Sequence, residues 1–238
     1  EYIETIDIAI RFLQGHEANF AFPIAQRQFL PEAGRFTGLA DLQWAFGSMG
    51  LTDQAKYIAT LYLEDLADYI KECVDQHFGF SRYAERLGRS AHSFDELYEA
   101  LQQNVSFIDA ILLRLLANHM EKQKPNMVCI SVPFPGNLYS AFRSAQFIKI
   151  HYPDVVVIMG GGFANTELRE IADTRVFSFF DYICLDDGEA PLMHLIEYGQ
   201  QKRPLELLKR TFALIDGKVV YLNNSLERDY KFNETGTP

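Results

Sequence analysis

The segment "VVVIMGGGFANTEL", residues 155–168, decides how the second half of this chain is interpreted. Four branched apolar residues lead towards Gly160, Gly161 and Gly162, and a plausible helix start follows. A continuous apolar run is typical of a parallel strand that is buried on both faces. Small residues at its carboxyl end, just ahead of a helix, are typical of a ligand-binding edge. The segment therefore predicts an α/β sheet, and it raises the question of what the glycines make room for.

The same alternation of strands and helices continues through the C-terminal half. Strands are expected at residues 126–134, 155–160 and 182–186, and helices at residues 138–152, 166–173 and 190–200. Residues 211–222 predict a β-hairpin with Asp216-Gly217 as its two-residue turn. We therefore expect an α/β fold: a Rossmann-like (flavodoxin-like), mostly parallel sheet, covered on both faces, with a C-terminal β-hairpin and a helical region before it.

The N-terminal half has helical periodicity. Apolar residues recur at spacings of three and four within residues 2–14 and 52–74, which predicts amphipathic helices, the second capped by Thr52. Ser93 and Glu96 have the spacing of a capping box, so a helix is expected to run from there through residue 120. These patterns divide the chain into a helical region, residues 1–124, an α/β domain, residues 125–225, and a linker, residues 226–238.

The composition argues against several classes of function. The net charge is −10, from 22 basic and 32 acidic residues, whereas a protein that binds a nucleic-acid backbone needs a basic face. No apolar run is long enough for a membrane span, and no signal peptide is visible. The short basic segment "KRPLELLKR", residues 202–210, is interpreted as a solvated face. We expect a protein without a nucleic-acid or membrane partner.

The cysteines indicate the compartment. Cys73, Cys129 and Cys184 lie more than 50 residues apart, which favours reduced thiols in a cytoplasm over a disulfide framework or a local metal site. Cys129 and Cys184 stand within apolar strands and are expected to be small core residues. The chain begins at Glu1 without a methionine and ends on the polar "NETGTP", so we expect it to be a segment of a longer protein.

Three loops follow the predicted parallel strands. They are the first loop, "SVPFPGN", residues 131–137, the second loop, "GGGFANT", residues 160–166, and the third loop, "LDDGEAP", residues 185–191. Ligands of open parallel sheets bind beyond the carboxyl ends of the strands, where the strand order switches. Each loop also precedes a predicted helix, whose first N–H groups can bind an anion. These loops are the candidate binding site.

Two common phosphate-binding motifs do not match. A dinucleotide fingerprint, GxGxxG, would use Gly160 and Gly162 but needs a glycine where Asn165 stands. A P-loop is excluded because the chain has no GK[ST] sequence. A glycine run after a strand is weak evidence alone, since a tight turn without a ligand also explains it.

The spacing of the first two loops is more specific. Ser131-Val132-Pro133 is separated from Gly160-Gly161 by 26 residues, as the SxL and GG elements are in cobalamin-binding domains, although Pro133 replaces the leucine. The amino-acid sequences of the three loops together resemble the N-terminal cobalamin-binding domain of B12-dependent radical SAM proteins. These are often described as Fe–S oxidoreductases or anaerobic magnesium-protoporphyrin monomethyl ester cyclase-like proteins. The resemblance covers about residues 125–224.

The resemblance implies a set of cobalamin-binding residues. They are Ser131, Val132, Pro133, Phe134, Pro135, Gly136, Asn137, Gly160, Gly161, Gly162, Phe163, Asp187, Gly188 and Glu189. The glycines would leave room for the nucleotide tail, Ser131 would donate a hydrogen bond to it, and Pro133 to Pro135 would support the corrin ring. Asp187 and Glu189 are either capping carboxylates or polar contacts to a corrin amide.

The sequence departs from the family in three respects. The DxHxxG motif, whose histidine binds cobalt, is absent. The segment Asp75 to Gly79 comes near to it, but its glycine stands one position earlier than the motif requires. His77 is therefore a poor candidate, and no metal ligand is predicted. The early strand that usually starts such a domain is also missing. The CxxxCxxC loop that holds a [4Fe–4S] cluster and S-adenosylmethionine is absent, so these would bind in a C-terminal radical SAM barrel outside this chain. The isolated chain is therefore expected to catalyse nothing.

Two alternatives remain open. A Rossmann-like nucleotide-binding domain would use the same glycines, with Asp186 as the acid that binds a ribose. A domain without a cofactor would serve only to dock the missing barrel. An open apolar groove between the first and second loops favours cobalamin, and a sheet edge filled by side chains favours docking.

Overall fold

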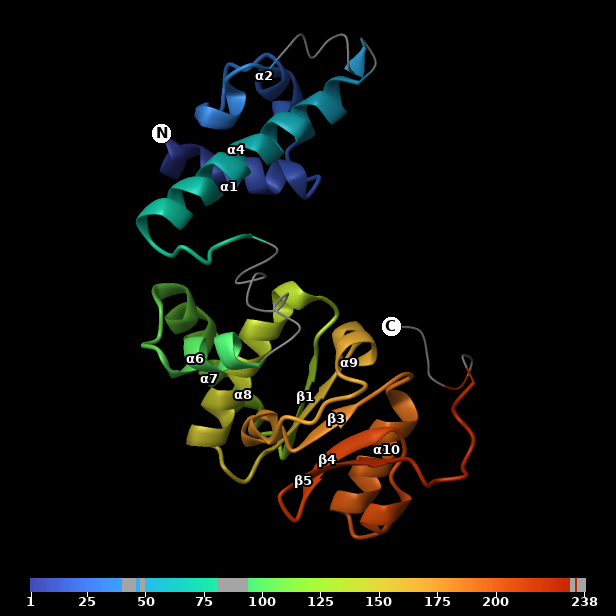
Figure 1. Ribbon diagram of the computed structural model, residues 1–238. Helices are drawn as coiled ribbons and strands as arrows, with labels where there is room; N and C mark the ends of the chain where they lie inside the picture. Colours follow the sequence, from blue (N-terminus) through green and yellow to red (C-terminus); the bar gives the residue numbers. More distant parts are fainter. Residues whose placement is uncertain (40–45, 48–49, 81–93, 232–233, 235–238) are drawn as a thin grey trace. The chain divides into compact units, whose positions relative to one another are not determined.

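A computed structural model describes residues 1–39, 46–47, 50–80, 94–231 and 234 of the chain. The chain forms two compact units, Glu1–Phe78 and Gly79–Pro238 (Figure 1). The first is helical and the second contains the sheet. The expected order of a helical region followed by an α/β domain is confirmed.

The described part of the first unit includes helices α1 (Tyr2–Leu13), α2 (Ala21–Ala25) and α4 (Leu51–Cys73), with short 3-10 turns at Ala18–Phe20 and Gly34–Phe36. The helices predicted over residues 2–14 and 52–74 are confirmed. The predicted cap is wrong, because α4 begins after Gly50 and has no side-chain cap. The Tyr62 ring is fully buried and stacks on Tyr2, while its hydroxyl bonds Thr5 Oγ1 at 2.9 Å. Tyr62 thus joins α4 to α1.

The chain at Ala33–Arg35, which follows α2, is held by one buried carboxylate. Asp65 of α4 accepts hydrogen bonds from the backbone N–H groups of Ala33 at 2.9 Å and Arg35 at 3.0 Å. These bonds satisfy donors that have no helix or strand partner, which is what a buried backbone requires. Asp65 therefore holds the described turn at Ala33–Arg35 against α4.

The second unit contains a five-stranded sheet of β1 (Met127–Ser131), β2 (Val156–Gly160), β3 (Tyr182–Cys184), β4 (Thr211–Ile215) and β5 (Lys218–Leu222). The strands lie in chain order, with β1–β2 and β2–β3 parallel and β3–β4 and β4–β5 antiparallel. The sheet is therefore mixed, with only its first three strands parallel. Among the described strands there is thus no switch in strand order of the kind at which ligands of open parallel sheets commonly bind.

Helices lie on both faces of the sheet, and the strand side chains alternate between the two faces. Val157 and Met159 of β2 point into a core shared with α6 (Asp95–Gln102), α7 (Phe107–Gln123), α8 (Leu138–His151) and α9 (Gly162–Glu167). Ile158, between them, points into a second core beneath α10 (Glu189–Gly199). Figure 1 shows α8, from the larger group of helices, and α10 on either side of the strands. Both cores are as expected for strands with continuous apolar runs.

Three local predictions need comment. The prediction of a single helix from residue 93 to 120 is wrong, because α6 and α7 are separate helices. The capping box lies at Ser106 and Asp109, at the start of α7. Ser93 is outside the described residues, and the N-cap of α6 is Phe94, which makes no side-chain cap. The helix expected at residues 166–173 is also misplaced, since α9 ends at Glu167. The hairpin is confirmed, with left-handed φ values of 49° at Asp216 and 73° at Gly217.

A buried ionic network joins α6, α7 and α8. Arg143 of α8 and Asp109 of α7 lie 3.2 Å apart and are almost fully buried. Between them the Tyr139 hydroxyl donates to Asp109 Oδ2 at 2.8 Å and accepts from Arg143 Nη2 at 2.7 Å. Burial raises the pKa of Tyr139 to about 12, so the hydroxyl stays protonated. Arg143 also donates to the carbonyl of Leu101 at the end of α6.

We expect Arg143→Ala to destabilise the second unit by about 3–5 kcal/mol, because it leaves the Asp109 carboxylate buried without its cation. Gln146→Ala is the control, because it removes two partly buried hydrogen bonds, one with Arg143 and one with Leu101 O, but leaves the ion pair in place; it is expected to cost roughly 1–2 kcal/mol. Urea denaturation followed by circular dichroism measures both. Equal losses in the two variants would contradict a central role for the ion pair.

Candidate functional site

A groove of about 400 Å³ lies at the carboxyl ends of the three parallel strands. Its floor is apolar and includes Cys129, Ile158 and Cys184, one from each strand. Its rim includes Ser131, Gly160 and Gly161, together with Asp186, Gly188 and Glu189 from the third loop. All three loops therefore contribute to one hollow, as the parallel strands predict.

The groove exists because α10 covers only part of its face of the sheet. Leu195 of α10 is buried in the same core as Ile158 and Cys184. Cys129 of β1, which is paired with Ile158, remains exposed. The hollow is bounded on one side by the N-terminal half of α10, which contributes Leu192, and remains open above β1.

The first and second loops touch through Gly161. This residue has a φ of 101° and a ψ of −179°, a conformation that is essentially restricted to glycine. A Cβ here would lie 2.7 Å from Val132 N, 2.8 Å from Val132 O and 2.9 Å from Ser131 Oγ. Val132 N–H donates to Gly160 O at 2.8 Å, and Phe163 N–H donates to Val132 O at 2.9 Å. The space beside Gly161 is thus filled by the first loop.

Gly162 and Gly160 differ in what they face. A Cβ at Gly162 would lie 2.9 Å from Pro133 O, so this glycine also permits the loops to pack. A Cβ at Gly160 would meet only Cys184 O, at an ordinary 3.7 Å. Gly160 lies on the same face of β2 as Ile158 and lines the groove, so its missing side chain leaves open space there.

The third loop is held from two sides. Asp186 has a left-handed φ of 59°, its N–H donates to Asn165 Oδ1 at 2.6 Å, and its carboxylate pairs with Arg169. From the other side Arg210 Nη2 donates to Asp187 O at 2.9 Å. Asn165, which replaces the third glycine of the dinucleotide motif, therefore links the second loop to the third.

The structure brings together part of the predicted set. Ser131, Gly160, Gly161, Gly188 and Glu189 line the groove. Val132, Gly136 and Phe163 are buried, and Phe134 is 70% exposed beyond the strand end. The remaining predicted residues, Pro133, Pro135, Asn137, Gly162 and Asp187, belong to the same loops but do not line the hollow. Neither expected cap forms, because Gly188 is the N-cap of α10 and no side chain bonds there.

Sequence reasoning missed part of the groove floor. Cys129 was expected in the core and is exposed, so that prediction is wrong; Cys184 is buried, as expected. Period-two alternation from Ser131 would have placed Cys129 on the same face of β1. Asp186, considered only for a ribose, is on the rim. Partial burial raises the pKa of the Cys129 thiol, and deeper burial raises that of Cys184 to about 12.

The histidines considered as metal ligands lie away from the groove lining. His77 is in the turn after α4, where its N–H donates to Asp75 Oδ1, and it does not follow a strand. His194 is buried on α10 and bonds Glu227 at 3.1 Å. In the part of the chain that the structure describes, no three His, Cys, Asp or Glu side chains are arranged to hold a metal ion.

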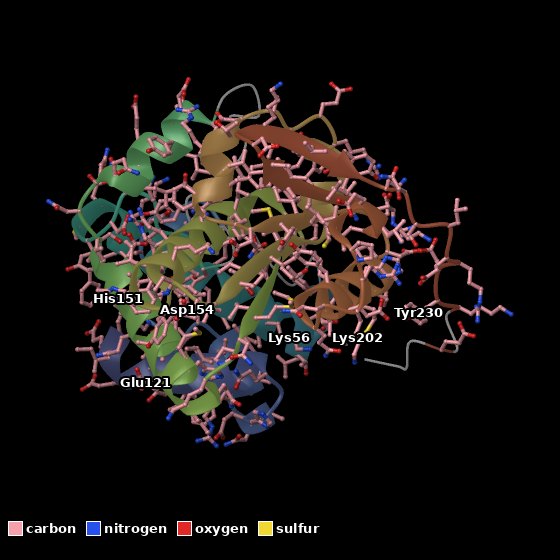
Figure 2. All side chains as sticks on the ribbon, turned by 90° about the horizontal axis from the view of Figure 1, so that it is seen from below. Lys56, Glu121, His151, Asp154, Lys202 and Tyr230 are labelled. Atoms are coloured by element: carbon pink, nitrogen blue, oxygen red, sulfur yellow. The ribbon has the colours of Figure 1, made fainter. Side chains whose placement is uncertain are left out.

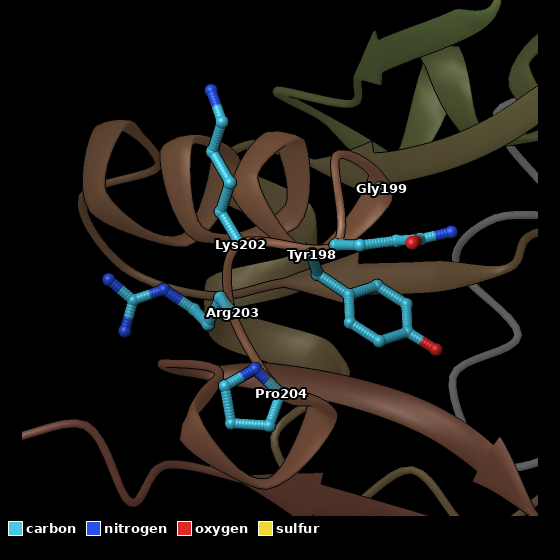
Figure 3. Close-up of a pocket in the computed structure, with 6 residues that line it drawn as sticks. Tyr198, Gly199, Lys202, Arg203 and Pro204 are labelled. Atoms are coloured by element: carbon cyan, nitrogen blue, oxygen red, sulfur yellow. The ribbon is translucent and has the colours of Figure 1, made fainter.

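A second hollow of about 640 Å³ lies at the C-terminal end of α10 (Figure 3). It is lined by Tyr198, Gly199, Gln201, Lys202, Arg203 and Pro204. Arg203 is committed to Glu197 and Glu227, each at 2.7 Å. None of the predicted site residues contributes to it, so it is the weaker candidate.

Comparison with known proteins identifies no relative: no protein-family model, curated protein or solved structure matches the chain. Within the described ranges, no helix combines the length and apolar character that crossing a membrane requires. The site must therefore be judged on its own geometry.

Gly161→Ala is expected to destabilise the second unit by roughly 2–4 kcal/mol, since its Cβ would overlap Val132 and its backbone conformation is unfavourable for alanine. Gly160→Ala is the matched control and is expected to change stability by less than about 1 kcal/mol. Urea denaturation compares them. Similar losses in both variants would show that the contact of Gly161 with the first loop is not limiting.

Thiol labelling distinguishes the two groove cysteines. In a Cys73→Ser background, iodoacetamide is expected to modify Cys129 in the folded protein, faster as the pH rises towards its raised pKa. Cys184 should react only after unfolding, because it is buried and its thiolate is scarce. Peptide mass mapping assigns the labelled residue. Equal labelling of both in the folded state would contradict the described burial.

Proposed function

We propose that the groove is a cofactor site that receives the nucleotide tail of a cobalamin. The observation that carries this proposal is the convergence of three loops on one groove where Gly160 leaves open space. The wording and spacing of the same loops, which resemble the B12-binding domain of radical SAM proteins, support it. The chain would then be a binding module, and catalysis would belong to a radical SAM barrel outside it.

The size of the groove suits a tail better than a whole corrinoid. A volume of about 400 Å³ is at the small end of ligand sites, so a broad corrin ring would remain outside. The exposed Phe134 and Pro133, beyond the end of β1, offer the apolar surface on which a ring would lie. This division matches the roles that the resemblance implies for the first loop.

The charges of the groove favour a ligand rich in amides. Its rim carries the carboxylate of Glu189 and that of Asp186, which pairs with Arg169, and among the described residues no lysine or arginine lines the groove. A nucleoside triphosphate or a dinucleotide would bring several negative charges beside those carboxylates, at a Coulombic cost. Amide N–H groups at the edge of a corrin would instead donate to them, and Ser131 would donate to the tail. The nucleotide-binding alternative is therefore less favoured.

Among the described residues no histidine lines the groove, and we propose that cobalt binds there without a histidine ligand. Cobalamin would supply a methyl group or redox chemistry to the parent enzyme, in a reaction such as methyl transfer or oxidative cyclisation. The residues described here would bind and orient the cofactor. The cofactor-free docking alternative draws support from Gly161 and Gly162, whose space is filled by the first loop.

Titration with hydroxocobalamin, followed by calorimetry and visible spectroscopy, tests the proposal. We expect saturable binding, protection of Cys129 from iodoacetamide, and a spectrum without histidine coordination. Gly160→Leu should weaken binding at least about 100-fold, because the side chain would fill the groove without a backbone overlap.

Gly199→Leu is the matched control, since a Cβ at Gly199 meets no atom within 4 Å and the residue is outside the groove. It should bind like the unchanged chain. Absence of binding to the unchanged chain would leave the docking alternative. Unchanged affinity in Gly160→Leu would place the cofactor elsewhere.

A further inference from the structure

The basic segment, residues 202–210, is only in part the solvated face that its sequence predicts, because Lys202 is exposed but the other three cations are not. The side chains of Arg203, Lys209 and Arg210 are only 9%, 10% and 12% exposed. Cations that are buried to this extent need partners. Their partners lie in the extended segment Asn223–Lys231, here called the strap, which follows β5 and has no regular secondary structure.

The strap is attached mainly by charge. Arg203 pairs with Glu227 at 2.7 Å, and His194 bonds the other oxygen of that carboxylate at 3.1 Å. Lys209 reaches Glu227 O at 2.5 Å and Asp229 at 3.1 Å. Leu226, by contrast, is fully exposed. Lys202 and Tyr230, from the basic segment and the strap, lie on the opposite side of the sheet unit from Glu121 and His151 (Figure 2).

Arg210 connects the strap to the groove. Its Nη1 donates to Asp229 Oδ2 at 2.9 Å, and its Nη2 donates to Asp229 Oδ1 at 2.7 Å. Nη2 also donates to Asp187 O in the third loop at 2.9 Å. This pairing lowers the pKa of Asp229 to about 2, so the carboxylate is charged at neutral pH. A bidentate pair fixes the plane of a guanidinium, and thereby the direction of its remaining N–H groups.

The backbone at this junction is unfavourable. Arg210 has a φ of 44° and Asp186 a φ of 59°, both left-handed and neither a glycine. Leu185 N–H donates to Arg210 O at 2.9 Å. Arg210 therefore lies opposite Leu185, the neighbour of Asp186, next to the last paired residues of β3 and β4. Such conformations persist only where surrounding contacts hold them, and they occur often at binding sites.

We propose that Arg210 is a positioning residue through which the strap sets the geometry of the third loop. When Asp229 binds Arg210, the guanidinium holds Asp187 O, and Asp186, Gly188 and Glu189 are kept at the rim of the groove. Release of the strap frees the guanidinium and loosens that rim. The chain that follows β5 thereby controls the groove. Only the effect on a bound cofactor rests on the proposed function; the effect on the loop does not.

Amide hydrogen exchange of the whole chain tests this coupling in three variants. Asp229→Asn should accelerate exchange about tenfold or more in residues 185–192, where the N–H groups of Leu185 and Asp186 are hydrogen-bonded. Glu227→Gln should leave exchange there unchanged, because the pairing of Arg210 with Asp229 is kept. Arg210→Lys should accelerate it in the third loop, while Lys209 and Arg203 still hold the strap.

An unchanged third loop in Asp229→Asn would overturn the proposal and leave the strap an independent attachment. Equal loosening of that loop by Glu227→Gln would also overturn it, because the coupling would bypass Arg210. Hydroxocobalamin affinity should fall about tenfold in Asp229→Asn and stay unchanged in Glu227→Gln. If the unchanged chain binds no cobalamin, the proposed function fails while the exchange experiment still decides the coupling.

Discussion

The contact of two backbones at Gly161 is the constraint from which the rest of the sheet edge follows. Because this residue lacks a Cβ, the first loop can approach the second closely. The N–H and C=O groups of Val132 then both form hydrogen bonds with the second loop, to Gly160 and Phe163. That closure starts α9 at Gly162, and α9 carries Asn165 to the point where it accepts a hydrogen bond from Asp186. The position of the third loop, and with it the groove, thus depends on a contact between the other two loops.

The features predicted correctly are those that local chemistry decides. The apolar runs at Met127–Ser131 and Val156–Gly160 fit a covered sheet, and Asp216-Gly217 suits a tight hairpin turn. The order of the strands was not predictable, because no local pattern encodes which strands become neighbours. The break before Phe107 was missed because the apolar periodicity continues across it, although Ser106 and Asp109 do have capping-box chemistry.

The site was predictable as three loops, but its details were not. A glycine in a sequence does not say whether its missing side chain makes room for a ligand or for another backbone. Gly160 and Gly161 are neighbours, and the answer differs between them. The basic segment posed the same difficulty. Sequence alone assigns Arg203 and Lys209 to solvent, because their partners Glu227 and Asp229 are distant in the sequence and come beside them only in the fold.

The bridge made by Asn165 has a consequence for motif searches. Replacing this residue by glycine would complete the GxGxxG pattern on paper, and the sequence would then score as a dinucleotide-binding domain. The same replacement would delete the amide oxygen that binds the Asp186 N–H and release the second loop from the third. A closer match to a known consensus would therefore come from a less organised site, because at this position the departure from the consensus is itself the structural device.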